Sequence, residues 1–295
     1  MPFSLSASVV VFDSDRALLR RTLESLAAAV AHAASRGLLA GARITIVDNG
    51  AAAGAMVDEQ YVPDFAPPAV PAANVATTAA LATTWRRISG QGNVGFGRGH
   101  NLVFRHDAAA AVDMHLVLNP DALLAADALT QGLAWMRDTP ECGMAAPNGA
   151  GPDGAPLFLC KRYPDVLTLL VRATAPAAIR KRFAGRLARY ELRDIVGEAA
   201  DQAAQGVPLA SGCCMLLRHE ALRHTNGFDP DFFVYFEDYD LSLRLAQGGA
   251  WRIDYLPAMR LVHFGGNAAR KSWAHIRMFI AGAARFFNKH GWKLV

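Results

Sequence analysis

Cysteine, long apolar runs and a strong excess of one charge are all scarce in this sequence. The 295 residues include only four cysteines, and none has the Cys-x-x-Cys spacing of a zinc or redox motif. Since Cys213 and Cys214 are adjacent, they cannot easily bond to each other, and a reduced, cytoplasmic protein is expected. No stretch reaches the roughly 18–20 apolar residues of a membrane span, and the first residues lack the basic start of a signal peptide.

The charge balance is equally modest. Thirty Lys and Arg residues against 26 Asp and Glu residues give a formal net charge of +4, most of it in the segment 160–193. A nucleic-acid binder usually concentrates its charge in a stripe with aromatic stacking platforms. That pattern is missing, so we expect no nucleic-acid partner. With 52% apolar residues, the chain can form one large α/β domain.

Strand and helix patterns alternate through the first half of the chain. Residues 6–12 form a β-branched apolar run typical of a strand buried on both faces. Leucines at helical spacing follow Ser14 and Asp15, either of which can cap a helix, and a second strand ends at residue 48. This order implies parallel strands joined by right-handed crossovers. Its continuation to residue 147 predicts a doubly wound, mostly parallel mixed sheet flanked by helices.

The second half of the chain adds helices to this sheet. Residues 160–205 are basic and helical in pattern, 251–257 and 258–266 are expected as two strands, and a helix pair is expected from 271 to 292. We therefore predict a catalytic domain over 1–265 with a basic helical insertion at about 160–205. A C-terminal helical segment over 266–295 is expected to pack on that domain.

Polar residues follow three of the predicted strands. They are Phe12-Asp13, Asp48-Asn49 and Asn119-Pro120-Asp121. Each is explicable as a turn, but ligands of open α/β sheets bind beyond the carboxyl ends of the strands, which favours a shared pocket. Asn119 and Asp121 place two oxygen donors on one side of an extended chain. Such donors suit Mg²⁺ or Mn²⁺ when substrate phosphates supply further ligands; the alternative is an Asx-Pro turn that caps the next helix.

A glycine-rich segment, GNVGFGRGHN, spans residues 92–101. It is neither a P-loop nor a dinucleotide-binding fingerprint. Ahead of a helix, such a loop can direct backbone N–H groups at phosphate, although a tight structural loop explains the glycines equally well.

Three carboxylates interrupt the otherwise apolar stretch FVYFEDYDLSLRL, residues 233–245. In a helix that starts near residue 236, Glu237 and Asp238 would occupy the first turn, which the helix dipole favours. Their apolar, aromatic surroundings would also raise a carboxyl pKa, as a general base requires. Asp240 can pair with Arg244 four residues later, and we assign it a structural role.

His263 follows the last predicted strand, in the segment LVHFGG. A lone histidine is more often a satisfied core residue than a ligand. The glycines after it and the basic pair Arg270-Lys271 favour a position facing phosphate or metal.

Taken in order, these motifs resemble glycosyltransferase family 2, and within it the bacterial rhamnosyltransferase-like branch. The resemblance runs from about residue 6 to 290 and rests on VDNG, GNVGFGRGHN, LNPD, FEDYDLSLRL and HFGG together. It implies a GT-A type nucleotide-sugar-binding fold, a divalent cofactor (Mg²⁺ or Mn²⁺) and an inverting single displacement.

The resemblance also implies roles for individual residues. Asp238 would be the catalytic base, supported by Glu237 on the acceptor side, and Asp121 with His263 would bind the metal. The residues expected to bind the nucleotide are Phe12, Asp13, Asp48, Asn93, Gly95, Asn101 and Asn119. Arg270 and Lys271 are expected at a diphosphate or lipid phosphate. The sequence departs from the family where Asn119 replaces the first Asp of the metal motif and where Phe12-Asp13 replaces Tyr-Asn.

The substrates follow from the same resemblance. It implies dTDP-L-rhamnose as donor and a polyprenyl-diphosphate-linked or oligosaccharide acceptor, in the synthesis of a cell-surface glycan such as lipopolysaccharide. The basic segment, in which Lys and Arg alternate with apolar residues, fits an interfacial helix at the inner membrane. It fits equally well a solvated helical pair that lies over the active site. The alternatives are a UDP- or GDP-sugar donor, or a non-catalytic module that binds nucleotide-sugar or lipid.

Overall fold

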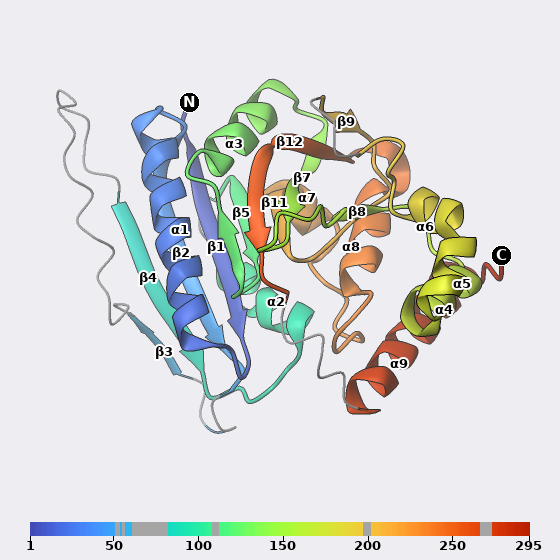
Figure 1. The fold of residues 1–295 in the computed structure, drawn as a ribbon. Coiled ribbons are helices and arrows are strands. Elements are labelled where there is room, and N and C mark those ends of the chain that lie inside the picture. The colour runs from blue at the N-terminus through green and yellow to red at the C-terminus, as the bar shows by residue number, and fades with distance from the viewer. Residues whose placement is uncertain (51–53, 55–56, 61–81, 108–111, 197–201, 266–272) are drawn as a thin grey trace.

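A ten-stranded mixed sheet forms the centre of the protein, with helices on both of its faces (Figure 1). The computed structural model describes residues 1–50, 54, 57–60, 82–107, 112–196, 202–265 and 273–295. The order of the strands is β3-β4-β2-β1-β5-β11-β7-β12-β6, and β9 pairs with β12. The strands of this sheet are β1 Phe3–Val11, β2 Leu39–Asp48, β3 Val57–Gln60, β4 Ala82–Ser89, β5 Met114–Leu118, β6 Ala122–Leu124, β7 Cys142–Ala150, β9 Ala204–Gln205, β11 Cys214–Arg218 and β12 Arg252–His263.

The helices and a small second sheet complete the fold. The helices are α1 Arg16–Ser35, α2 Phe96–Asp107, α3 Ala128–Asp138, α4 Val166–Thr174, α5 Ala177–Arg182, α6 Ala184–Tyr190, α7 His219–His224, α8 Glu237–Ala246 and α9 Trp273–His290. The second sheet pairs β8 Cys160–Lys161 with β10 Leu209–Ala210. Within the described residues, no helix is both long enough and apolar enough to cross a membrane.

Strands β1, β2, β4 and β5 are parallel neighbours, as the sequence predicts. Alternate residues of each strand face opposite layers, so Val9 joins the core beneath α1 and α3 while Val117 joins the core against α2, α7 and α8. The cap of α1 is also confirmed, because the Asp15 carboxylate accepts a hydrogen bond from the Leu18 N–H at 2.9 Å.

The strand ends that carry predicted site residues lie at one edge of the sheet. Strand β11 is antiparallel to β5 and β7, while β12 is parallel to β7. As a result, the ends of β1, β2, β5 and β12 and the start of β11 all lie at the same edge. This arrangement brings residues 12–13, 48–49, 119–121 and 263 to one side of the molecule.

Two predictions about the second half are wrong in detail. The expected strands 251–257 and 258–266 form the single strand β12, whose register shifts between Leu256 and Arg260. Pro257 lies in this interval and has no N–H to donate to a neighbouring strand. A proline is normally excluded from a regular central strand, and the register shift at this point makes it compatible with β12.

The expected C-terminal helix pair is likewise one continuous helix, α9. Gly282 lies near its middle, where a glycine normally weakens a helix. Here the glycine is required, because an added Cβ would lie 2.7 Å from the carbonyl oxygen of Tyr235. Helix α9 therefore packs directly on the loop that precedes α8. The predicted boundary at 265/266 adjoins residues outside the described part of the chain and stays a prediction.

Candidate active site

The turn Asn119-Pro120-Asp121 leaves the end of β5 and meets the end of β12. The Asn119 N–H donates to the Cys213 carbonyl at 2.9 Å, and the Phe264 N–H donates to the Asp121 carbonyl at 3.0 Å. These bonds orient the side chains so that Asp121 Oδ1 and His263 Nε2 lie 3.0 Å apart. The Asn119 amide nitrogen lies 3.4 Å from the same His263 nitrogen. Three predicted ligand residues thus converge from two strands.

The chemistry of this trio fits a divalent cation only in part. The Asp121 and His263 side chains are 14% and 18% exposed, so they are held firmly yet remain accessible. Within the described residues, no cluster of three or more His, Cys, Asp or Glu side chains could hold a metal. A closed structural zinc site is therefore a poor fit. A carboxylate, an imidazole and an amide oxygen fit Mg²⁺ or Mn²⁺ whose remaining ligands are phosphate oxygens.

Two aromatic residues in an unusual conformation precede the carboxylates of α8. Tyr235 and Phe236 have φ values of 71° and 69°, in the left-handed region that bulky residues rarely enter. The Phe236 ring packs between Phe279 and Phe286 of α9, with ring centroids 5.1 and 5.5 Å away. This aromatic packing stabilises a turn that would otherwise be unfavourable, as is common at functional sites.

Helix α8 begins at Glu237, as predicted, and Asp238 is in its first turn. Asp238 Oδ2 accepts a hydrogen bond from the Gly212 N–H at 2.9 Å. The next residue, Cys213, provides the carbonyl that accepts from the Asn119 N–H. Two consecutive residues directly before β11 therefore separate the proposed base from the proposed metal motif.

Burial changes the ionisation of both acids. It raises the pKa of Asp238, and hydrogen bonds from the Gly212 and Tyr239 N–H groups lower it only in part. Burial raises the pKa of Glu237 further, and the neighbouring Asp238 charge adds to that effect. Glu237 is 5% exposed, and its Oε2 has no hydrogen-bond partner among the described residues. Backbone N–H donors thus favour the ionised form of Asp238, whereas Glu237 Oε2 has no such donor among the described residues.

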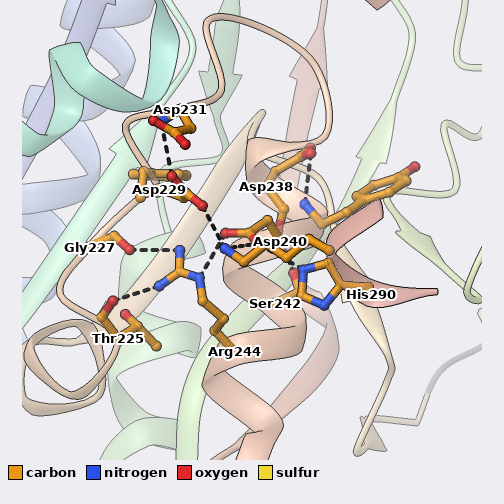
Figure 2. A network of polar contacts seen from close by, with 12 residues as sticks. Thr225, Gly227, Asp229, Asp231, Asp238, Asp240, Ser242, Arg244 and His290 are labelled. Atoms are coloured by element: carbon orange, nitrogen blue, oxygen red, sulfur yellow. Dashed lines mark hydrogen bonds and ion pairs between the residues drawn. The ribbon is translucent and has the colours of Figure 1, made fainter. Parts of the chain in front are cut away.

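The structural role predicted for Asp240 is confirmed. Its fully buried carboxylate accepts a hydrogen bond from Arg244 Nε at 2.7 Å (Figure 2). From α9, Lys289 Nζ lies 2.6 Å and His290 Nε2 lies 2.8 Å from its other oxygen. Arg244 also donates to the Thr225 and Gly227 carbonyls. Asp240 therefore fastens α8 to both α9 and the preceding loop.

The predicted nucleotide residues form a second group at the same edge. Asp48 is bound by Arg87 at 2.6 Å and by the Gly50 N–H at 2.9 Å. Asn93 accepts a hydrogen bond from the Gly95 N–H at 3.1 Å, which shapes the glycine-rich loop. Gly95 has a φ of 86°, and an added Cβ would lie 2.2 Å from the Phe233 carbonyl oxygen. The glycine-rich loop thus abuts the loop that carries the carboxylates.

The remaining predicted site residues differ in burial and in the contacts that they make. Asn101 is buried, and its amide both donates to and accepts from the backbone of Phe228, at 2.7 and 2.9 Å. This geometry makes Asn101 a positioning residue for the loop, and its contact with a nucleotide stays a prediction. Phe12 is 57% exposed, and Asp13 adopts a φ of 49° beside it. Arg270 and Lys271 lie outside the described residues.

Sequence reasoning missed Gly212. An added Cβ there would lie 3.0 Å from the Phe96 ring and 3.4 Å from the Asp238 Cβ, so only a small residue keeps the contact. The small residues Ser211-Gly212 before a buried strand were the available signal. Arg87, the partner of Asp48, was missed as well, because strand pairing and not sequence spacing brings it close.

Comparisons with known sequences identify the family of this chain. A family model described as "Glycosyltransferase like family 2" matches residues 72–279. The chain is 27% identical over 151 residues to the N-acetylglucosaminyl-diphospho-decaprenol L-rhamnosyltransferase of Mycobacterium tuberculosis, covering 51% of this chain and 47% of that protein. It is 41% identical over 64 residues to rhamnosyltransferase WbbL of Escherichia coli, covering 22% of this chain and 24% of that protein. The matches therefore span half or less of these relatives.

Solved structures share the fold. GalNAc-T7, crystallised with UDP, GalNAc and Mn²⁺, aligns with a TM-score of 0.59 at 14% identity, over 97% of this chain and 48% of that one. The mannosyltransferase PcManGT of Pyrobaculum calidifontis, in complex with GDP-Man and Mn²⁺, aligns with a TM-score of 0.54 at 16% identity, over 97% and 65%. At these identities the likeness concerns the fold alone, and the predicted GT-A type α/β architecture is confirmed.

Proposed function

Because this chain belongs to glycosyltransferase-like family 2, we propose that it is an inverting transferase that moves L-rhamnose from dTDP-L-rhamnose to a sugar hydroxyl. The acceptor we propose is a lipid-linked or polysaccharide sugar in the synthesis of a cell-surface glycan such as lipopolysaccharide. Curated relatives named as rhamnosyltransferases support this donor, and the mycobacterial one is named for a diphosphate-linked lipid acceptor. The enzyme would then work at the cytoplasmic face of the inner membrane.

One observation carries the proposal: the hydrogen-bonded link from Asp238 through Gly212 and Cys213 to Asn119. It holds a carboxylate of raised pKa close to a carboxylate–imidazole pair. A direct displacement with inversion needs a base on one side of the anomeric carbon and stabilisation of the leaving group on the other. The two halves of the site supply these two requirements.

In the proposed mechanism, Asp238 accepts the proton of the acceptor hydroxyl as its oxygen attacks the anomeric carbon. The bond from that carbon to the diphosphate breaks at the same time, and dTDP leaves on the opposite face. The raised pKa of Asp238 makes it a better proton acceptor than an exposed aspartate. Glu237, whose Oε2 has no partner among the described residues, would hold the acceptor hydroxyl or its sugar.

Asp121 and His263 would hold Mg²⁺ or Mn²⁺. The ion would neutralise negative charge on the leaving diphosphate. Around it we propose that Phe12, Asp13, Asp48, Asn93 and Gly95 contact the nucleotide. Asp48 is suited to contact the nucleobase, because Arg87 fixes its carboxylate at the end of β2.

Two measurements test this function. The first is thermal stabilisation by dTDP, UDP and GDP, each with and without Mn²⁺. Metal-dependent stabilisation by dTDP supports the proposed donor, whereas a preference for UDP or GDP keeps the family and discards the donor. The second is the Asp238→Asn variant, which is expected to bind the nucleotide normally and lose at least about a hundredfold in transfer rate, the usual scale of acid–base catalysis. Normal turnover in this variant would refute the assignment of the base.

A further inference from the structure

A cavity of about 430 Å³ opens between α4, α6 and the C-terminal residues, on the flank that Figure 1 shows at the right. The cationic side chains in its lining are Arg162, Arg186, Arg189 and Lys293. Among the described residues that line it, Asp165 alone carries a carboxylate side chain, and the rings of Tyr163 and Tyr190 complete its polar walls. Its volume is in the range of small-molecule sites.

Two of these four cations are neutralised within the protein. Arg162 binds both oxygens of Asp194 at 2.7 and 2.6 Å. Arg186 binds Asp165 at 3.0 Å.

The other two cations are Arg189 and Lys293. Over the part of the chain that the structure describes, neither forms an ion pair with a carboxylate. The charge of Arg189 helps to lower the pKa of Asp194, but Arg162 already occupies both oxygens of that carboxylate. Cations that have no ion-pair partner of their own, beside a concave, aromatic-walled site, attract an anion, and phosphate matches the fork of an arginine.

The cavity adjoins the acceptor side of the proposed site. Tyr190 lines it, and the Tyr190 hydroxyl lies 2.8 Å from the Tyr239 hydroxyl, one residue after Asp238. Pro208 also lines it, immediately before β10, and the chain continues from there to Gly212, which binds Asp238. Two separate links, the Tyr190–Tyr239 contact and the chain from Pro208 to Gly212, therefore join the cavity to the Asp238 carboxylate.

Two exposed apolar side chains lie on segments that contribute residues to this cavity, α4 and the C-terminal residues. Leu170 of α4 and Leu294 are 54% and 66% exposed. They belong to neighbouring segments, because the Leu167 N–H donates to the Leu294 carbonyl at 3.2 Å. A ligand with a phosphate head and a hydrocarbon tail would match the cations of the cavity and the exposed apolar residues of these segments.

We propose that this cavity is a phosphate-binding subsite, which holds the diphosphate of a lipid-linked acceptor while the sugar hydroxyl lies at Asp238. The ligand's identity rests on the proposed function, whereas its phosphate chemistry rests on the cations alone. The sequence predicts a similar role for Arg270 and Lys271, which lie outside the described residues.

The first test uses inorganic pyrophosphate as the probe, in the presence of a chelator so that no divalent ion contributes. The Arg189→Gln/Lys293→Gln double variant is compared with Arg180→Gln/Lys181→Gln, which removes the same charge from α5 without touching the cavity. Calorimetry is expected to show at least tenfold weaker binding in the first variant and unchanged binding in the second. Equal behaviour of the two variants would overturn the subsite.

The second test measures transfer to two acceptors. One is N-acetylglucosaminyl diphosphate with a short prenyl chain, and the other is the same sugar as a neutral alkyl glycoside. The Arg189→Gln/Lys293→Gln variant is expected to raise KM at least tenfold for the first acceptor, with kcat and the neutral acceptor unaffected. An equal KM change for both acceptors would contradict the proposal.

Vesicles of phosphatidylglycerol separate an acceptor phosphate from a bilayer headgroup. If the double variant loses vesicle binding and keeps its KM for the diphosphate acceptor, the cavity serves the membrane and the acceptor assignment is wrong. If the wild-type protein transfers sugar to neither acceptor, the proposed function fails, and the pyrophosphate comparison still decides whether the cavity binds phosphate.

Discussion

The Gly282→Ala substitution in α9 is expected to disturb the loop that carries the proposed base. In this variant the added Cβ would lie 2.7 Å from the Tyr235 carbonyl oxygen and 3.3 Å from the Phe236 ring if nothing moved. The first of these separations is too short for a carbon and an oxygen that are not bonded, so either the loop or the helix must move. Overpacking of this kind costs about 1–3 kcal/mol.

The same substitution also has a favourable effect. Alanine is better than glycine inside a helix by about 1 kcal/mol, so the net destabilisation expected for Gly282→Ala is about 0–2 kcal/mol. Gly185→Ala in α6 provides the matched control, because no atom of the described residues lies within 4 Å of the position that its Cβ would take. That control is expected to gain the same helix-propensity term of about 1 kcal/mol, which leaves a difference of about 1–3 kcal/mol between the variants.

Urea denaturation measures this difference, and a transfer assay measures its consequence. Displacement of a catalytic group by about 1 Å can reduce a rate by about a hundredfold, so a shift of a few tenths of an ångström is expected to lower kcat severalfold. Gly185→Ala is expected to keep full activity. If Gly282→Ala proves as stable and active as Gly185→Ala, the close contact between α9 and the loop does not position the base.

Three other substitutions test the carboxylates of the site. Asp240→Asn leaves Lys289 and Arg244 without their buried counter-charge and is expected to cost about 3 kcal/mol in urea denaturation; a free energy of unfolding equal to that of the wild type would show that the network is not stabilising. Burial raises the folded-state pKa of Glu237 above its unfolded value, so its contribution to stability is complete below the unfolded pKa and is lost as pH rises through the folded one. Glu237→Gln is therefore expected to match the wild type at low pH and to be more stable above neutrality, and parallel stability curves would contradict this. Asp121→Asn is expected to abolish the metal-dependent part of the dTDP thermal shift without lowering the Tm of the free protein; an unchanged shift would remove Asp121 from the metal site.

Local signals explain what the sequence predicted well. The β-branched run of β1, the leucine spacing of α1 and the Asp15 cap each depend on residues within a few positions of one another. The start of α8 is predicted by its acidic first turn for the same reason. Side-chain periodicity and capping are encoded within one element, so these assignments do not require the tertiary fold.

Contacts between distant segments explain what the sequence did not predict. The Gly212–Asp238 hydrogen bond joins residues 26 apart, and the ion pair of His290 with Asp240 spans 50 residues. Neither has a sequence pattern, because each depends on where β11 and α9 lie relative to α8. The continuity of α9 was missed for a related reason: the contact that makes Gly282 compatible with a helix is made by another loop.

The start of β11 acts as a spacer within the proposed site. Gly212 holds Asp238 and Cys213 holds Asn119, and both adjoin a strand that pairs with β5 on one side and β7 on the other. The separation of the two halves is thus set by the central sheet. Redesign of this protein for other sugars should therefore leave residues 211–214 unchanged, since a change there would alter the gap across which transfer must occur.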